Sequence, residues 1–203
     1  MIKEQGKPEL ILENYMSFMS YGIETQRGIA DTKEEKLVLS ESKFALKNVS
    51  LLDSFGEKKA LIEAIGFFDE NNVPITNLKQ GTQVKFICEF STSINLYEVG
   101  IGVLFKDTLN NEILTFNSYM YNAPLKYVEQ NKRMRAVISF RVPKLHPREY
   151  LVTVALSEGT QLNHVQQHWI HSATTINIIS CDFIDGCMFS LYPNEIEYNY
   201  EQI

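Results

Sequence analysis

From Lys43 onward, apolar and polar residues alternate with a period of two, and this pattern limits most strongly what the chain can fold into. Successive side chains of a strand point to opposite faces, so the alternation predicts strands with one buried face. Polar turn residues separate the candidate strands, as at Asn110-Asn111 and Glu158-Gly159. Short strands with such turns and almost no helix predict an all-β fold over residues 43–180, an antiparallel β-sandwich of the immunoglobulin-like or jelly-roll type. The predicted strands cover residues 44–52, 60–68, 83–90, 99–105, 112–119, 134–142, 150–156 and 174–179.

The same alternation predicts which side chains face the core. The inward residues are Val84, Phe86, Cys88 and Phe90 on one strand, Met134, Ala136, Ile138, Phe140 and Val142 on another, and Tyr150, Val152, Val154 and Leu156 on a third. The opposite face of the strand at 134–142 carries Arg133, Arg135, Ser139 and Arg141. That face is therefore expected to be solvated.

The stretch from Glu98 to Tyr121 reads as a hairpin with a polar turn at residues 109–112. Its first strand alternates large apolar residues with Gly100, Gly102, Leu104 and Lys106, and glycine within a strand indicates close approach of another backbone or a ligand. On the second strand, Asn117, Tyr119 and Tyr121 follow Ile113 and Thr115 on one face. This polar, aromatic face is the predicted functional surface.

Composition and charge exclude several functional classes. The net charge of −6 and the pI near 5.3 argue against binding to nucleic acid or to an anionic bilayer. No apolar run is long enough to span a membrane, and the first ten residues lack the apolar core of a signal peptide, so a cytoplasmic location is expected. Three cysteines without CxxC spacing favour reduced, buried thiols over disulfides or a zinc site, with Cys88 in phase with a buried strand face.

The two ends of the chain differ from its middle. Residues 1–21 contain apolar residues at helical spacing and Pro8 near the start, which predicts a short amphipathic helix. Residues 22–42 are polar and without periodicity, which predicts a linker. The aromatic-rich segment 181–203 fits either a further strand or an arm that pairs with another subunit.

Four stretches between about residues 55 and 180 together resemble one family. They are GFFDENNVPITNLKQGTQVKFICEF, LYEVGIGVLFKDTLNNEILTFNSYMYN, RAVISFRVPKLHPREYLVTVAL and HWIHSATTINI. They resemble the C-terminal polysaccharide-binding domain of Wzt-type ATP-binding subunits of ABC transporters, which export O-antigen-like glycans. The N-terminal GKPELILENYMSF is similar to the last helix of an ABC ATPase domain, but the sequence has no GxxxxGK[ST] phosphate-binding loop.

The resemblance implies a non-catalytic module that recognises a lipid-linked, O-antigen-like polysaccharide before its export. It implies as partners an ABC ATPase domain, in the same chain or a separate one, and a membrane permease, at the inner face of the plasma membrane. Family members tend to pair as homodimers. The alternative is an assembly domain that dimerises the transporter ATPase without touching the glycan.

Candidate binding residues follow from the chemistry of sugars, which stack on aromatic rings and pair with amides and charged groups. They are Asn117, Tyr119, Tyr121, Trp169 and Arg135. For the tyrosines the alternative role is to cover a sheet edge, for Trp169 to anchor the core, and for Arg135 to lie on a solvated face.

No catalytic group, cofactor or metal is expected. His164, His168 and His171 invite a metal interpretation, but on a strand the first two would face one way and His171 the other. The same alternation places Gln167, Trp169 and His171 on one face, with His168 and Ile170 on the opposite face. No carboxylate pair or nucleophile motif is evident in the sequence, so an enzyme is not expected.

Overall fold

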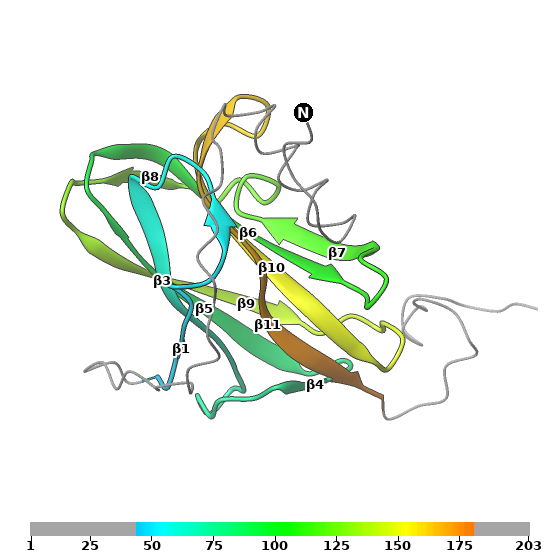
Figure 1. The fold of residues 1–203 in the computed structure, drawn as a ribbon. Coiled ribbons are helices and arrows are strands. Elements are labelled where there is room, and N and C mark those ends of the chain that lie inside the picture. The colour runs from blue at the N-terminus through cyan, green and yellow to red at the C-terminus, as the bar shows by residue number, and fades with distance from the viewer. Residues whose placement is uncertain (1–43, 181–203) are drawn as a thin grey trace, which may run out of the picture.

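The computed structural model describes residues 44–180, which form two β-sheets packed face to face (Figure 1). The four-stranded sheet, here sheet A, has the order β1-β3-β5-β9. The seven-stranded sheet, here sheet B, has the order β2-β11-β10-β6-β7, with β4 paired to β11 and β8 paired to β6. The strands of sheet A are β1 (Lys47–Asn48), β3 (Ala60–Phe68), β5 (Gln83–Thr92) and β9 (Arg133–Arg141). Those of sheet B are β2 (Ser54–Phe55), β4 (Asn77–Lys79), β6 (Leu96–Lys106), β7 (Glu112–Asn117), β8 (Leu125–Val128), β10 (Glu149–Gly159) and β11 (His164–Ile179).

The prediction of an all-β fold is confirmed. All strand pairs are antiparallel except β4 with β11, which is parallel. The finer immunoglobulin-like or jelly-roll class stays a prediction. No helix within residues 44–180 is long and apolar enough to cross a membrane. The predicted N-terminal helix (1–21), the linker (22–42), the C-terminal arm (181–203) and two of the three cysteines lie outside the described residues.

Several predicted strand bounds are wrong. The strand expected at 44–52 is reduced to Lys47–Asn48, because the chain turns at residues 50–52. The strand expected at 174–179 begins ten residues earlier, at His164. The hairpin turn falls at 107–111 rather than 109–112, since the Asp107 carboxylate accepts hydrogen bonds from the Leu109 and Asn111 amides, both at 2.9 Å. The Asn111 side chain also donates from its Nδ2 to the Asp107 carboxylate at 2.9 Å, and this bond, together with the two backbone bonds, lowers the pKa of Asp107.

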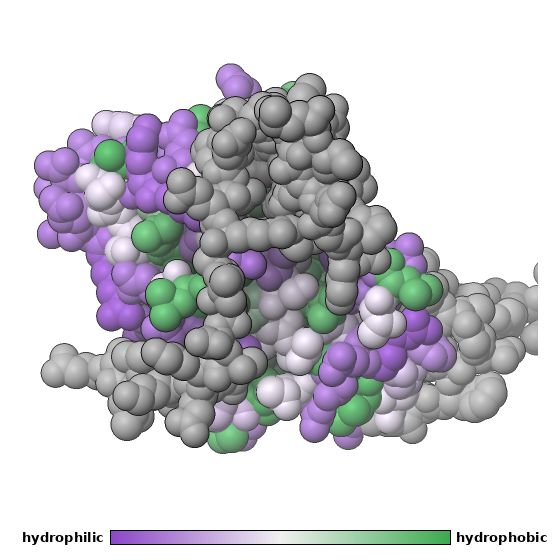
Figure 2. All heavy atoms as spheres, viewed as in Figure 1, coloured by the Kyte–Doolittle hydropathy of each residue, from purple (hydrophilic) through white to green (hydrophobic). Residues whose placement is uncertain are grey.

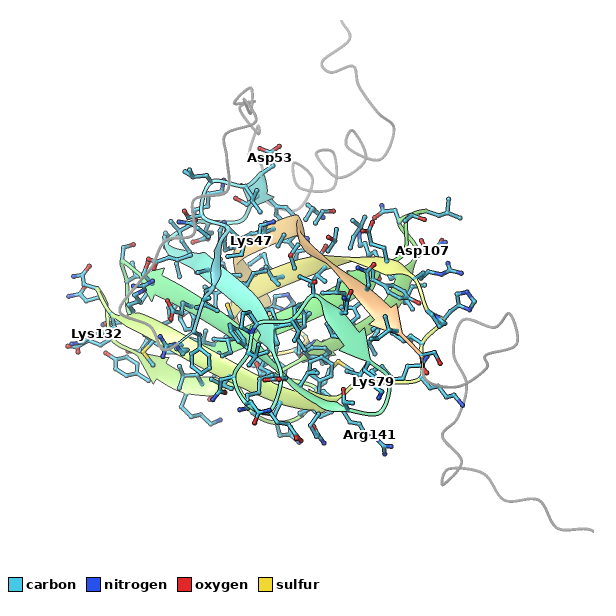
Figure 3. All side chains as sticks on the ribbon, turned by 90° about the horizontal axis from the view of Figure 1, so that it is seen from below. Lys47, Asp53, Lys79, Asp107, Lys132 and Arg141 are labelled. Carbon is cyan, nitrogen blue, oxygen red and sulfur yellow. The ribbon has the colours of Figure 1, made fainter. Side chains whose placement is uncertain are left out.

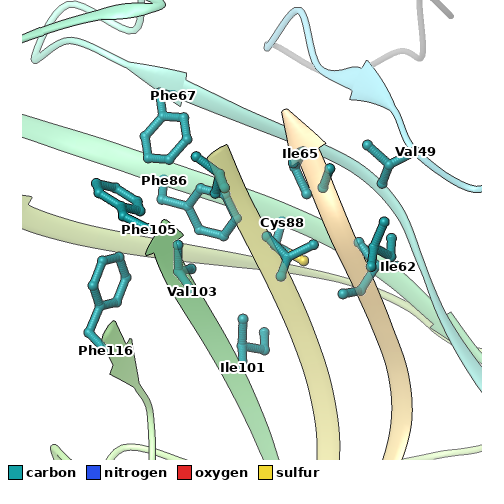
Figure 4. Packing of buried hydrophobic residues seen from close by; sticks show 14 of the residues in the cluster. Val49, Ile62, Ile65, Phe67, Phe86, Cys88, Ile101, Val103, Phe105 and Phe116 are labelled. Carbon is teal, nitrogen blue, oxygen red and sulfur yellow. The ribbon is translucent and has the colours of Figure 1, made fainter. Parts of the chain in front are cut away.

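The core lies between the two sheets, as the alternation predicts. Aromatic rings from both layers meet there: Phe67 and Phe86 belong to sheet A, and Phe105 and Phe116 to sheet B (Figure 4). The predicted inward faces of β5, β9 and β10 all belong to this core or pack against it, and Cys88 is fully buried, which raises the pKa of its thiol to about 12. Burial of these apolar faces is the main source of stability.

Charged side chains lie around the rim, with Lys132 just before one end of β9 and Arg141 at the other (Figure 3). In the view of Figure 2, hydrophilic residues predominate over the described surface and apolar residues form small groups.

The outer face of β9 is exposed as predicted. Two of its arginines, however, converge on Glu89 of β5, which is almost fully buried. Arg133 Nη2 and Arg135 Nε each lie 2.8 Å from a Glu89 carboxylate oxygen.

One buried histidine links the two sheets. His168 of β11 is 1% exposed, and its Nδ1 accepts a 2.9 Å hydrogen bond from the backbone N–H of Ile62 in β3. That amide lies at a bulge, where the register between β3 and β5 shifts between Ile62 and Ala64. A bulge leaves a backbone group without its ladder partner, and the imidazole supplies one. Burial lowers the pKa of His168 to about 4, so the ring is neutral and able to accept.

The acid stability of the domain should depend on His168. Its pKa is lowered in the folded state, so its contribution is complete above the unfolded value of 6.5 and is lost as the pH falls from 6.5 toward 4. The shift corresponds to about 3 kcal/mol of unfolding free energy. His168→Asn keeps an acceptor near the position of Nδ1 but cannot be protonated. Urea unfolding at pH 7 and pH 4.5 should show a smaller loss of stability in this variant than in the wild type. Equal losses in both proteins would contradict the assignment.

The Glu89 cluster should stabilise the fold. Glu89→Ala removes the shared acceptor of two guanidinium groups, but both arginines are partly exposed and regain water. The expected loss in unfolding free energy is about 1–2 kcal/mol. Glu129→Ala is the matched control, because Glu129 pairs with Lys132 on the exposed surface and should change stability by less than about 0.5 kcal/mol. Chemical denaturation measures both, and equal losses would exclude a special role for Glu89.

Candidate functional site

The outer face of sheet B, on the side away from the core, contains a groove with a volume of about 240 Å³. Its floor follows β6 and β10, and its walls come from β7, from the turn that follows β7, and from β11. The lining residues are Gly100, Ile101, Gly102, Val103, Leu104, Glu112, Thr115, Asn117, Tyr119, Thr153, Ala155, Ser157, Gln161, His164, Gln166 and Trp169.

The groove is hollow because small residues lie opposite one another in the middle of the sheet. Gly102 of β6 is the direct partner of Asn117 on β7 and of Ala155 on β10, and Ala155 is the partner of Trp169 on β11. Directly opposite residues share a face. The row therefore runs from an amide, across a glycine and an alanine, to an indole. The next row has the same character, since Gly100 lies opposite Ser157, and Ser157 lies opposite Gln166.

The two glycines have different roles. A Cβ on Gly100 would lie 2.2 Å from Cε2 of Tyr119, so only glycine allows the Tyr119 ring to rest on the strand. A Cβ on Gly102 would meet only the Cβ atoms of Ala155 and Asn117, both at 3.6 Å, which is ordinary contact. The sequence predicts close approach of another backbone or a ligand at these glycines, but the close neighbour of Gly100 is the Tyr119 side chain. At Gly102 the strand surface lies open to the groove.

Tyr119 forms one end wall of the groove. Its hydroxyl donates to the backbone oxygen of Glu98 at 2.8 Å, and the Ser157 hydroxyl lies 3.4 Å from the phenol oxygen. Burial raises the pKa of Tyr119, so the phenol stays protonated. The His164 ring lies beside it, with 6.3 Å between the ring centroids. These contacts fix the orientation of the aromatic wall.

Trp169 forms the wall across the sheet. Its indole stacks on Phe55 of β2, with centroids 5.8 Å apart and planes at 24°, and its Nε1 donates to Nδ1 of His171 at 3.3 Å. Burial lowers the pKa of His171 to about 4, so the imidazole is neutral and accepts this bond. Phe55 and His171 together hold the indole in place, and it remains partly exposed to the groove.

Two amide side chains have defined orientations in the groove walls. Asn117 accepts a hydrogen bond from the Met120 amide through its Oδ1, at 2.9 Å, which orients its Nδ2 as a donor. Gln166 donates from Nε2 to the backbone oxygens of Leu156 and His168, at 2.8 and 3.0 Å. Glu112 is the one carboxylate among the lining residues, and the lining contains no lysine or arginine. The groove thus combines flat rings, planar amides and hydroxyls with little charge.

The structure brings together three of the five predicted site residues. Asn117, Tyr119 and Trp169 all line the groove. Tyr121 does not: β7 ends at Asn117, so the expected alternation stops there, and Tyr121 is 68% exposed in the turn that follows. Arg135 lies on β9 of the opposite sheet, where it pairs with Glu89 and its guanidinium lies 5.4 Å from the Phe44 ring centroid.

The three histidines are arranged differently from the prediction. His164 lies beside Tyr119 on the groove side, whereas His168 points inward, because a register shift between Leu156 and Ser157 of β10 interrupts the alternation of β11. The prediction that His164 and His168 share a face is therefore wrong. Trp169 and His171 do lie together as predicted, opposite the buried His168 and Ile170, while Gln167 falls at the bulge. Within residues 44–180, no three histidine, cysteine or acidic side chains gather as metal ligands.

Sequence reasoning missed Gln166, Phe55 and the small floor residues of β10. A signal for the floor was present: Gly100 and Gly102 occupy outward positions on one strand, and Ala155 and Ser157 do so on another. Their registration could not be read from the sequence, because it depends on which strands pair. Phe55 belongs to a two-residue strand, too short for any periodicity to mark it.

One solved structure supports the architecture. A crystal structure of the C-terminal domain of Wzt superposes with a TM-score of 0.60 at 18% identity, covering 70% of this chain and 89% of that one. A Niemann-Pick type C2 protein from the Japanese carpenter ant reaches a TM-score of only 0.41 at 9% identity over 64% of this chain and 98% of that one, and supports no conclusion here. Comparison with curated proteins gives no significant match. The family model of the Wzt C-terminal domain matches residues 52–189, so this chain belongs to the Wzt C-terminal domain family.

Proposed function

We propose that this domain is a non-catalytic carbohydrate-binding module and that a glycan lies in the groove on the outer face of sheet B. The observation that carries the proposal is the row Asn117–Gly102–Ala155–Trp169, in which a glycine and an alanine leave room between an amide and an indole. Sugar rings have apolar C–H faces that stack on aromatic side chains and hydroxyls that pair with amides. The groove provides both kinds of group within one sheet face.

The lining favours uncharged sugars. With Glu112 as its one carboxylate and no lysine or arginine, the groove has no group suited to hold a phosphate or a carboxylate by ion pairing. A hydrolytic role finds little support in the same residues, because glycoside hydrolysis commonly uses two carboxyl groups on either side of the bond that breaks. The side chains that line the groove are therefore suited to binding a glycan and not to cleaving it.

The family supplies the setting for this binding. As a member of the Wzt C-terminal domain family, the module is proposed to recognise a lipid-linked, O-antigen-like polysaccharide in the cytoplasm. Its partners would be an ABC ATPase domain and a membrane permease at the inner face of the plasma membrane, and it would act as a homodimer. Binding of the glycan would then select the substrate that the transporter exports.

Trp169 reports on the groove directly, because it is the single tryptophan of the chain and lies in the groove wall. Titration with lipid-free surface polysaccharide from the source strain should change its fluorescence saturably. Asn117→Ala should weaken binding about tenfold or less, the worth of one or two hydrogen bonds. Tyr121→Ala and Arg135→Ala are the controls and should bind as the wild type does. An assembly domain without glycan contact would show no fluorescence change, although light scattering would report a dimer.

Filling the floor tests the position of the ligand. Gly102→Val adds a side chain that projects into the groove from a position where a Cβ meets only ordinary contacts. Valine suits a strand, so the melting temperature should be unchanged or higher, while polysaccharide binding should fall more than tenfold by calorimetry. Gly100→Ala is the contrasting variant, since its Cβ would displace the Tyr119 ring. A Gly102→Val protein that is stable and binds normally would place the glycan elsewhere.

A further inference from the structure

A second aromatic surface lies further along β6, outside the groove. Tyr97 of β6 and Tyr127 of β8 are direct cross-strand partners, and their ring centroids are 5.2 Å apart with the planes at 47°. The two residues are 58% and 46% exposed. Large apolar rings gathered on a surface indicate a binding role more often than isolated ones do. This pair is here called the tyrosine platform.

The tyrosine platform faces the same side of sheet B as the groove. The neighbouring cross-strand pair, Leu96 with Val128, is buried in the core, so alternation directs Tyr97 and Tyr127 outward. Glu98 then has a positive φ of 50°, which interrupts the alternation of β6. After it, Val99 is buried again and Gly100 faces the groove. The outward positions of β6 therefore run from Tyr97 through Gly100 and Gly102 to Leu104.

Tyr119 connects the two surfaces. Its ring rests on Gly100, within the groove, and its hydroxyl bonds to the backbone of Glu98, the residue next to Tyr97. Tyr97 and Gly102 are five positions apart on β6, which corresponds to about 15 Å at the rise of a strand. One sugar ring cannot contact both Trp169, in the row of Gly102, and the tyrosine platform. A chain of several sugars can.

The tyrosine platform has the chemistry of a sugar site. Each ring offers an apolar face and a hydroxyl. Beside the rings, Lys126 pairs with Glu98 at 3.0 Å and the Glu158 carboxylate accepts a hydrogen bond from the Tyr97 amide at 2.8 Å, which supplies further donors and acceptors but no unpaired cation. The core does not need these rings, since the buried cluster includes Leu96 and Val128 but neither tyrosine. An uncharged ligand thus suits the tyrosine platform as it suits the groove.

From these observations we infer that Tyr97 and Tyr127 form a second sugar subsite, which binds another part of the same glycan chain. The inference rests on the proposed function and goes beyond it, because it makes the ligand an oligosaccharide segment that extends along β6. Affinity then increases with chain length until the glycan reaches from Trp169 to Tyr97, and remains constant for longer chains.

The test uses oligosaccharides of graded length, made by partial acid hydrolysis of lipid-free surface polysaccharide from the source strain and separated by size. Affinities are measured by Trp169 fluorescence and by calorimetry. In the wild-type protein, affinity should increase with length and then level off. The double variant Tyr97→Ala/Tyr127→Ala should bind the shortest active fragments like the wild type and the long ones about tenfold more weakly. Tyr121→Ala, which removes an exposed tyrosine that does not line the groove, is the matched control and should behave as the wild type.

Three results would overturn the inference. If the double variant binds every length like the wild type, the tyrosine platform does not contact the glycan. If it turns a dimer into a monomer by light scattering, the tyrosine platform is a protein interface. If no fraction binds the wild-type protein at all, the proposed function fails together with the inference. The first result would reject the second subsite alone and would leave the proposed function standing.

Discussion

The two-faced character of β6 is the constraint on which the rest of the described structure depends. Its inward residues Val99, Ile101, Val103 and Phe105 belong to the core between the sheets, while Gly100 and Gly102 face outward. Because the side-chain period of a strand is two, a shift by one residue would put the glycines in the core and the large apolar residues in water. Burial of the inward face therefore fixes the register of β6 against β7 and β10, and this register aligns Asn117, Gly102, Ala155 and Trp169 in one row.

Alternation in the sequence predicts the long strands and their inward faces well. β3, β5, β9 and β10 are found close to their expected positions. β5, β9 and β10 each have one apolar face with regular spacing, whereas a bulge between Ile62 and Ala64 interrupts the spacing in β3. The short strands β2, β4 and β8 could not be predicted, since two to four residues carry no measurable period. The positions of the bulges could not be predicted from the sequence either. The positive φ of Glu98 and the register shifts in β11 depend on tertiary partners such as Tyr119 and Ile62.

The candidate site was predictable in part for the same reasons. Residue type and face pointed to Asn117, Tyr119 and Trp169, and all three meet in one groove although they come from two separate parts of the chain. The charge of Arg135 predicts a contact with sugar, but the sequence does not reveal that the buried Glu89 lies opposite Arg135 and is bound to it by hydrogen bonds. Alternation extended past Asn117 places Tyr121 on the same face, but the chain leaves the strand there and forms a turn. The positions of Arg135 and Tyr121 both depend on which strands pair and where a strand ends, and these depend on residues far apart in the sequence.

The residues at the floor of the groove can change without disturbing the core, and this affects how the ligand preference of such domains can evolve. Gly102 and Ala155 are cross-strand partners on the solvent side of sheet B, while the residues next to them in sequence belong to the core. Alternate residues of the same strands thus determine two different properties: the outward residues shape the ligand site, and the inward residues supply the folding free energy. Substitutions at the floor positions can reshape the groove one methyl group at a time while the sandwich retains its packing. The same fold can in this way bind many different polymers, and its sequence can diverge while the fold is retained.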